Sequence, residues 1–111
     1  MARTKDQLGD VFVALGIPCA NETWWPDTPP QLPYVILCCE GVSTTQLDNI
    51  NRLRLTRYRL EVYTHGRNEE LEHDIEQALT EYGFTYGMRP VGIIDQTDVY
   101  EMQFTLTVIG D

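Results

Sequence analysis

The chain has 111 residues, of which 42% are hydrophobic, and this size suits one domain with a modest core. Its formal net charge of −9 argues against a protein that holds nucleic acid by neutralising phosphates. No apolar run is long enough to cross a membrane, and the first residues lack the pattern of a signal peptide. We therefore expect one soluble, cytosolic domain over residues 1–111, with no membrane partner.

The first predicted element is a helix over residues 5–15. Thr4 is a good N-cap, and Gly16 followed by Pro18 ends the helix. The apolar residues recur at helical spacing and form one stripe: Leu8, Val11, Phe12 and Leu15.

Residues 17–33 form a loop that contains five of the six prolines and both tryptophans. Trp24 and Trp25 either fold back onto the edge of the core or supply an interface anchor. The second reading rests on the enrichment of tryptophan at binding hot spots. Both readings stay open at this point.

Two strands follow the loop. The apolar run 34–39 predicts a strand that is buried on both faces or covered by a partner, and Glu40 begins its end. Residues 42–51 are polar, include Asp48 and Asn49, and form either a mobile arm or an extension of the hairpin beyond the core. In the long strand 52–64, two sets of apolar residues lie in opposite phase, which predicts a β-bulge near Thr56.

Half of the eight basic residues lie on this long strand, whereas the next helix is strongly acidic. That division suits complementary contact between copies of the chain. The alternative is that the same arginines pair with carboxylates within one chain. The four basic residues on the long strand are Arg52, Arg54, Arg57 and Arg59.

Asn68 caps the second predicted helix, which Gly83 ends. Its inward stripe is Leu71, Ile75, Ala78, Leu79 and Tyr82, while Glu72 is counted among the acidic residues that cover the other faces. An imperfect edge strand over 84–94 and an alternating strand from Tyr100 to Val108 complete the chain. The order α-β-β-α-β-β predicts an α+β fold: an antiparallel sheet of about four strands with two helices packed on it.

No catalytic motif is present, so we expect no enzymatic activity, no catalytic residues and no cofactor. Glu69 and Glu72 lie near His73 and resemble half of a metal site, but a solvated acidic face is the favoured reading, and no metal is expected. The three cysteines, Cys19, Cys38 and Cys39, lack metal-ligand spacing and are expected to be reduced thiols.

The segment DNINRLRLTRYRLEVYT, the turn HGRN, the helix EHDIEQAL, the tyrosine-rich GFTYG and the final strand YEMQFTLTVIG occur in this order. Together they resemble the small tail-completion proteins of long-tailed bacteriophages and prophages, also called tail terminator or tail-to-head joining proteins. The likeness runs from Pro33 onward and also fits the initial helix. The loop with Trp24 and Trp25 has no counterpart in that pattern.

The resemblance implies a virion structural protein that assembles as a ring, usually a hexamer, on the tail tube protein. Such a ring stops polymerisation of the tube and offers a surface to the head-tail connector protein, with DNA passing through the lumen without specific binding. It would reside in the host cytoplasm during assembly and in the tail or neck of the virion afterwards. Head completion or a neck connector role is the neighbouring alternative, and a small bacterial ligand-binding domain or enzyme is the alternative from another class.

Overall fold

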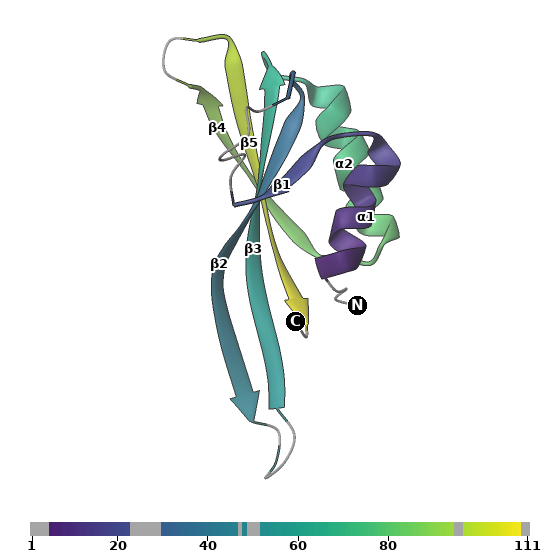
Figure 1. The fold of residues 1–111 in the computed structure, drawn as a ribbon, viewed down its shortest axis with the longest axis vertical. Helices are drawn as coiled ribbons and strands as arrows, with labels where there is room; N and C mark the ends of the chain where they lie inside the picture. Colours follow the sequence, from purple (N-terminus) through teal and green to yellow (C-terminus); the bar gives the residue numbers. More distant parts are fainter. Residues whose placement is uncertain (1–4, 23–29, 47, 49–51, 95–96, 110–111) are drawn as a thin grey trace.

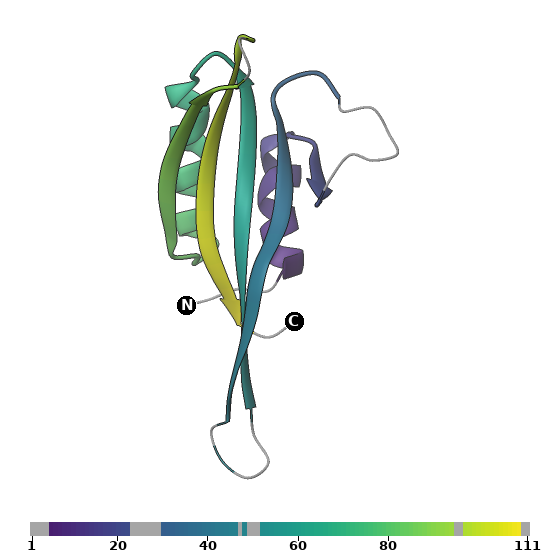
Figure 2. The ribbon, with the colours of Figure 1, turned by 90° about the vertical axis from the view of Figure 1, so that its left-hand side faces the viewer.

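The computed structural model describes residues 5–22, 30–46, 48, 52–94 and 97–109. In this part of the chain a single sheet carries both helices on one of its faces, and no described helix lies over the other face (Figure 1, Figure 2). The strand order in the sheet is β1-β2-β3-β5-β4. The elements are α1 (Lys5–Leu15), β1 (Cys19–Asn21), β2 (Tyr34–Gln46), β3 (Arg52–His65), α2 (Glu69–Glu81), β4 (Tyr86–Ile93) and β5 (Val99–Ile109).

The α+β class with two helices is confirmed, but the expectation of about four antiparallel strands is wrong. The described sheet has five strands and is mixed, because β1 lies parallel to β2 and the remaining neighbours are antiparallel. Hydrogen bonds at both ends hold β1 in place, from Val35 N–H to the Pro18 carbonyl (2.9 Å) and from Glu22 N–H to the Leu37 carbonyl (2.7 Å). A strand of three residues is too short to show a period of two, so the sequence pattern did not reveal it.

The core lies between the helices and the sheet. Leu8, Val11 and Phe12 of α1 are buried as the sequence predicts, and α1 has the predicted bounds. Every second residue of β5 from Tyr100 to Val108 is buried on the helix-covered face. β4 is the irregular edge strand that its glycines and proline predict, with a register shift between Pro90 and Gly92.

Local signals set both ends of α2. The Asn68 side chain accepts a hydrogen bond from Leu71 N–H (3.0 Å), which satisfies one of the free amides of the first turn. Gly83 has a φ of 87°, in the left-handed region that glycine adopts without strain, and Phe84 N–H then reaches the Leu79 carbonyl (2.9 Å). The predicted helix boundaries are therefore confirmed.

The predicted bulge in the long strand is wrong, because β3 keeps a regular alternation. Tyr58, Leu60 and Val62 point into the core together with Thr56, which is 2% exposed. Leu53 and Leu55 lie in the opposite phase, on the face without helices. The irregularity lies in the partner strand instead, between Cys39 and Gly41 of β2.

The sequence pattern predicts Glu72 on a solvated face of α2, and this prediction is wrong. Glu72 is 6% exposed, and its Oε1 accepts a hydrogen bond from Nη2 of Arg67 (3.3 Å). The same guanidinium lies over the ring of Tyr100, 5.8 Å from the ring centroid. Arg67, which lies in the connection between β3 and α2, thereby holds that connection against Glu72 of α2 and Tyr100 of β5.

Ile75 supplies a test of the inward face of α2, because its side chain is fully buried. Ile75→Ala should lower the free energy of unfolding by about 2–5 kcal/mol, since it leaves a cavity against the sheet. Leu71→Ala, one turn earlier and only partly buried, should cost less, and Gln77→Ala on the exposed side should cost almost nothing. Urea denaturation followed by circular dichroism measures all three. Harmless changes at both Ile75 and Leu71 would show that this face is wrongly assigned.

Candidate subunit interface

The end of the β2–β3 hairpin projects from the body of the molecule as an arm, which we define as residues 43–46 and 52–55 (Figure 1). Thr44 pairs with Arg54 and Gln46 with Arg52, whereas β5 reaches β3 only as far as the pair Leu55 and Ile109. Segments 44–46 and 52–54 therefore pair only with each other. For residues 43–46 the structure shows an extension of the hairpin beyond the core, whereas residues 47 and 49–51 of the predicted arm lie outside the described residues.

β2 continues through the point where the sequence predicted its end. Glu40 is an extra residue in the ladder, so that Cys39 faces Tyr58 and Gly41 faces Arg57. Such a bulge interrupts the hydrogen bonds of the ladder. Here the carboxylate of Glu22 accepts a hydrogen bond from Cys39 N–H (2.9 Å), which holds the end of β1 against the irregular part of β2.

A polar network covers part of the sheet face that has no helices. Arg59 contacts Glu61 through Nε (2.9 Å) and Glu40 through Nη1 (3.1 Å). Burial alone would lower the pKa of Arg59, but the hydrogen bond and charge of Glu61 outweigh it and raise that pKa. The arginine is thus a fixed cation held by two carboxylates.

Tyr63 joins the same network by donating a hydrogen bond from its hydroxyl to Glu61 (2.9 Å). Burial, that hydrogen bond and the charge of Glu101 raise the pKa of Tyr63 far above its usual range, so the phenol stays neutral. Glu101 itself is 8% exposed and accepts a hydrogen bond from Gln103 (2.8 Å). The carboxylates of Glu61 and Glu101 are therefore both hydrogen-bonded within the chain.

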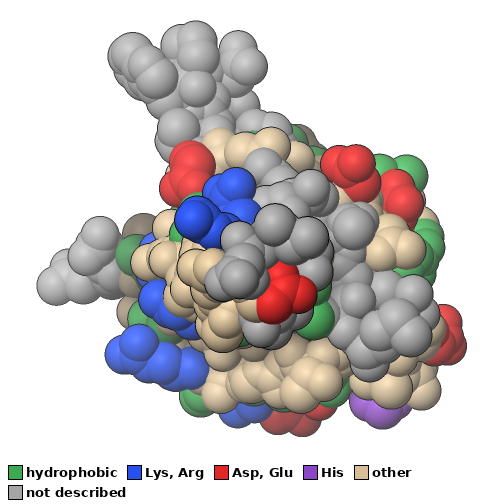
Figure 3. Space-filling view, turned by 90° about the horizontal axis from the view of Figure 1, so that it is seen from below, with side chains coloured by type: hydrophobic (Ala, Val, Ile, Leu, Met, Phe, Trp, Pro, Cys, Tyr) green, Lys and Arg blue, Asp and Glu red, His purple; other side chains and the backbone are tan. Residues whose placement is uncertain are grey.

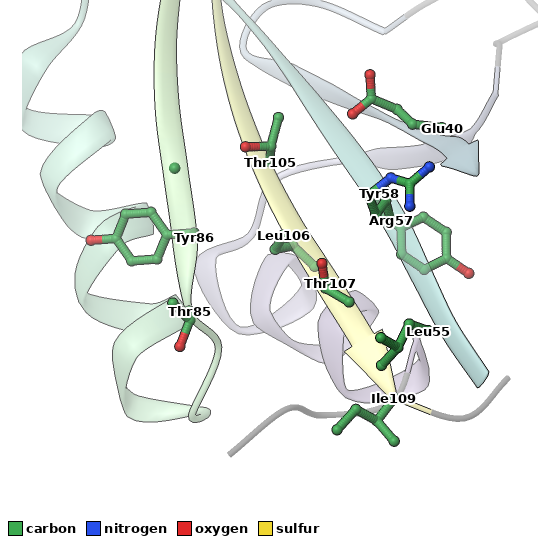
Figure 4. A pocket seen from close by; sticks show the side chains of 11 residues that line it. Glu40, Leu55, Arg57, Tyr58, Thr85, Tyr86, Thr105, Leu106, Thr107 and Ile109 are labelled. Atoms are coloured by element: carbon green, nitrogen blue, oxygen red, sulfur yellow. The ribbon is translucent and has the colours of Figure 1, made fainter. Parts of the chain in front are cut away.

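A groove of about 490 Å³ lies lower on the same face, where β3 and β5 run past the start of β4 (Figure 4). Arg57 and Glu40 line one side, and Leu55 and Ile109 lie at the end nearest the arm. The Arg57 guanidinium lies against Gly41, where a Cβ atom would collide with it. No ion pair involves Arg57 among the described residues, in contrast to Arg59.

The four arginines of the long strand thus fall into two classes. Arg59 follows the alternative reading, in which an arginine pairs within its own chain. Arg52, Arg54 and Arg57 are exposed and form no ion pair with any described residue. Alternation along β3 places Arg52 and Arg54 on one face of the hairpin and Arg57 on the other.

Acidic side chains gather on the helices. α1 contains two acidic residues and α2 contains six, against a single basic residue, Lys5. In a view along the arm, Lys and Arg side chains lie mainly over the sheet, on the left, while the helix side on the right shows Asp and Glu (Figure 3). The helix layer is therefore strongly acidic, whereas the sheet layer holds most of the arginines together with several carboxylates.

Three of the predicted interface residues, Trp24, Trp25 and Asn49, lie outside the described residues. Asp48 is described and exposed, at the connection between β2 and β3. The structure thus brings the described candidates to the arm and to the adjoining sheet face. Sequence reasoning missed the network around Glu61 and Glu101. The spacing of two residues along β3 could have indicated the contacts of Glu61 with Arg59 and Tyr63, but only the strand register brings Glu40 to Arg59 and places Glu101 opposite Tyr63.

The described residues contain no group of three or more His, Cys, Asp or Glu side chains placed to hold a metal ion. His65 contacts Asp98 (2.9 Å between Nδ1 and Oδ2) at an exposed site, and His73 is exposed on α2. All three cysteines are free. No helix in the described segments has the length and apolar character needed to span a bilayer.

No protein-family model matches the sequence, and no curated protein matches it. Among solved structures, the chain is similar to a chain in the virion of a native gene transfer agent (GTA) particle, with a TM-score of 0.58. The two share 16% sequence identity, and the match covers 95% of this chain and 90% of that chain. At so low an identity the comparison establishes a common fold, which extends over nearly the whole of both chains.

Shortening the arm should leave the body of the protein intact. Removing residues 44–46 together with 52–54 deletes three complete cross-strand pairs and keeps the register of the rest. We expect the melting temperature to stay nearly unchanged, because none of these residues belongs to the core, and we expect any self-assembly to be lost. Thermal unfolding and sedimentation velocity measure the two effects. Loss of cooperative unfolding would show that the arm is part of the folding unit.

Arg57 and Arg59 should respond differently to charge reversal. Arg59→Glu places a third carboxylate beside Glu40 and Glu61 and should lower the melting temperature by roughly 5 °C or more. Arg57→Glu should change the stability of the subunit by less than about 0.5 kcal/mol, because it breaks no ion pair within the described chain. Calorimetry on the two single variants distinguishes them. Equal losses would mean that Arg57 is also held within the subunit.

Proposed function

We propose that this chain is a structural protein of a long-tailed phage or phage-like virion, where it caps the tail tube. In this role a ring of copies, six in the simplest case, ends polymerisation of the tube and joins the tail to the head connector. The observation that carries the proposal is the fold shared with a virion chain over 95% of this protein. The sequence resemblance from Pro33 onward independently favours the tail-completion role.

The surface chemistry supports assembly from identical copies. A closed ring needs two different patches on each subunit, because its contacts are head-to-tail. The arm and the adjoining sheet face offer exposed arginines, and the helices offer exposed carboxylates. Opposite charges on opposite layers guide neighbouring copies into one orientation and discourage the reverse one.

DNA is expected to pass such a ring without being held. Each copy has a formal charge of −9, so six copies together repel phosphate, and the excess of acidic residues does not supply a binding track. In this proposal the exposed arginines face other protein subunits.

A head-completion or neck connector protein is the alternative within the same class, since it would also use a ring and an extended arm. An enzyme or ligand-binding domain is the alternative from a different class, and the groove beside Arg57 is where it would hold a small molecule. The position and stoichiometry of the chain in a particle distinguish all three.

Loss of the gene in a strain that produces the particles is the direct test. If the chain caps the tube, electron microscopy should show tails of uncontrolled length without attached heads, and plasmid-borne protein should restore particles. Tails of normal length beside headless or leaking capsids would instead indicate head completion. Normal particles, or purified virions without the chain by mass spectrometry, would contradict the proposal.

A further inference from the structure

The arm carries two cations on one face with no partner in the described part of its own subunit. Arg52 and Arg54 are exposed, and because they are two residues apart on β3 they point the same way. Along a strand, that spacing separates their Cα atoms by about 6.6 Å. The hairpin residues paired with them, Gln46 and Thr44, are uncharged. This face of the arm therefore carries a row of two positive charges, which we call the arm ladder.

The outer surface of α2 presents a complementary row of negative charges, which we call the helix ladder. Glu70, Asp74 and Glu81 fall at i, i+4 and i+11, so they lie along one side of the helix, and all three are exposed. None of them forms an ion pair with a described residue, whereas Glu69 and Glu72 contact Arg67 and Glu76 accepts a hydrogen bond from Tyr86. Glu70 and Asp74 are separated by about 6 Å along the helix axis, close to the spacing of the two arginines.

The two ladders cannot meet within one subunit. The arm projects at the end of the molecule away from α2, and the two views agree on this (Figure 1, Figure 2). The molecule extends over 53 Å along that axis. Each ladder is thus available to a different molecule, and the same chain supplies both members of the pair.

We propose that the arm of one copy lies along the outer face of α2 of a second copy, with Arg52 and Arg54 against Glu70 and Asp74. This inference rests on the proposed assembly from identical copies and specifies its contact. The contact is head-to-tail, since it uses different surfaces of the two subunits, and repetition of it generates a ring or a filament. The arm then connects adjacent subunits, and its length sets the distance between them.

Charge reversal of each ladder tests the contact. The variants are Arg52→Glu with Arg54→Glu, called the arm variant, and Glu70→Arg with Asp74→Arg, called the helix variant. Sedimentation velocity of the full chain at about 50 mM and about 500 mM salt measures self-association. Wild-type self-association should weaken at high salt, and each variant should associate about tenfold or more weakly than wild type at low salt.

Recombining the reversed charges gives the decisive comparison. An equimolar mixture of the arm and helix variants should assemble with alternating copies, because each reversed arm then meets a reversed helix. A single chain with all four substitutions should also recover association. Two matched controls should have no effect: Asp6→Arg with Asp10→Arg, which reverses an exposed pair four residues apart on α1, and Arg89→Glu on the edge strand β4. Melting curves confirm that every variant is folded.

Several outcomes would overturn the inference. These are a wild-type chain that stays monomeric at all concentrations, variants that associate normally, a mixture without recovery, or an effect of the α1 control equal to that of α2. Binding of wild type to duplex DNA that the arm variant loses, with self-association unchanged, would assign the arginines to phosphate instead. A virion that contains the chain in a ring without this coupling would remove the inference and leave the proposed function standing.

Discussion

The long antiparallel ladder between β2 and β3 is the constraint on which the rest of the structure depends. β3 lies at the centre of the sheet, with β2 on one side and β5 on the other, so its alternation decides which residues face the helices. The same ladder continues beyond the end of β5 and becomes the arm. One pairing register therefore positions the core, the polar network and the projecting charges together.

The charge division follows from the way the two layers are built. α2 is attached to the sheet by its apolar stripe, so its acidic residues, with the exception of the buried Glu72, are directed outward or lie at the edge of the interface with the sheet. The strands present one side chain in two to the face without helices, and on β3 these include arginines as well as a glutamate. Most exposed arginines of the described chain therefore lie on the sheet and the arm, whereas the helices carry an excess of carboxylates; the sheet also holds Glu40, Glu61 and Glu101.

Pairing of charges within the chain is selective. Arg59 and Arg67 are held by carboxylates of the same chain, and Tyr63 and Gln103 donate hydrogen bonds to Glu61 and Glu101. Such residues are poor candidates for a new partner, since the contact would first have to break an existing network. Among the described residues, the exposed arginines outside that network are Arg52 and Arg54 on the arm, Arg57 in the groove and Arg89 on β4, and the proposed contact between copies uses the two on the arm.

The sequence by itself determined both helices with their caps, the alternation of β5, the irregular edge at β4 and the absence of a known catalytic motif. These features depend on neighbours within about a turn of helix or a few residues of strand, and such signals are local. Only the tertiary structure decided the parallel β1, the bulge at Glu40, the burial of Glu72 and the division between paired and unpaired arginines. Each of those depends on which residue lies opposite in another strand or helix. The alternation of Tyr58, Leu60 and Val62 indicates which face of β3 is buried, but it does not determine which residues of β2 and β5 lie opposite them.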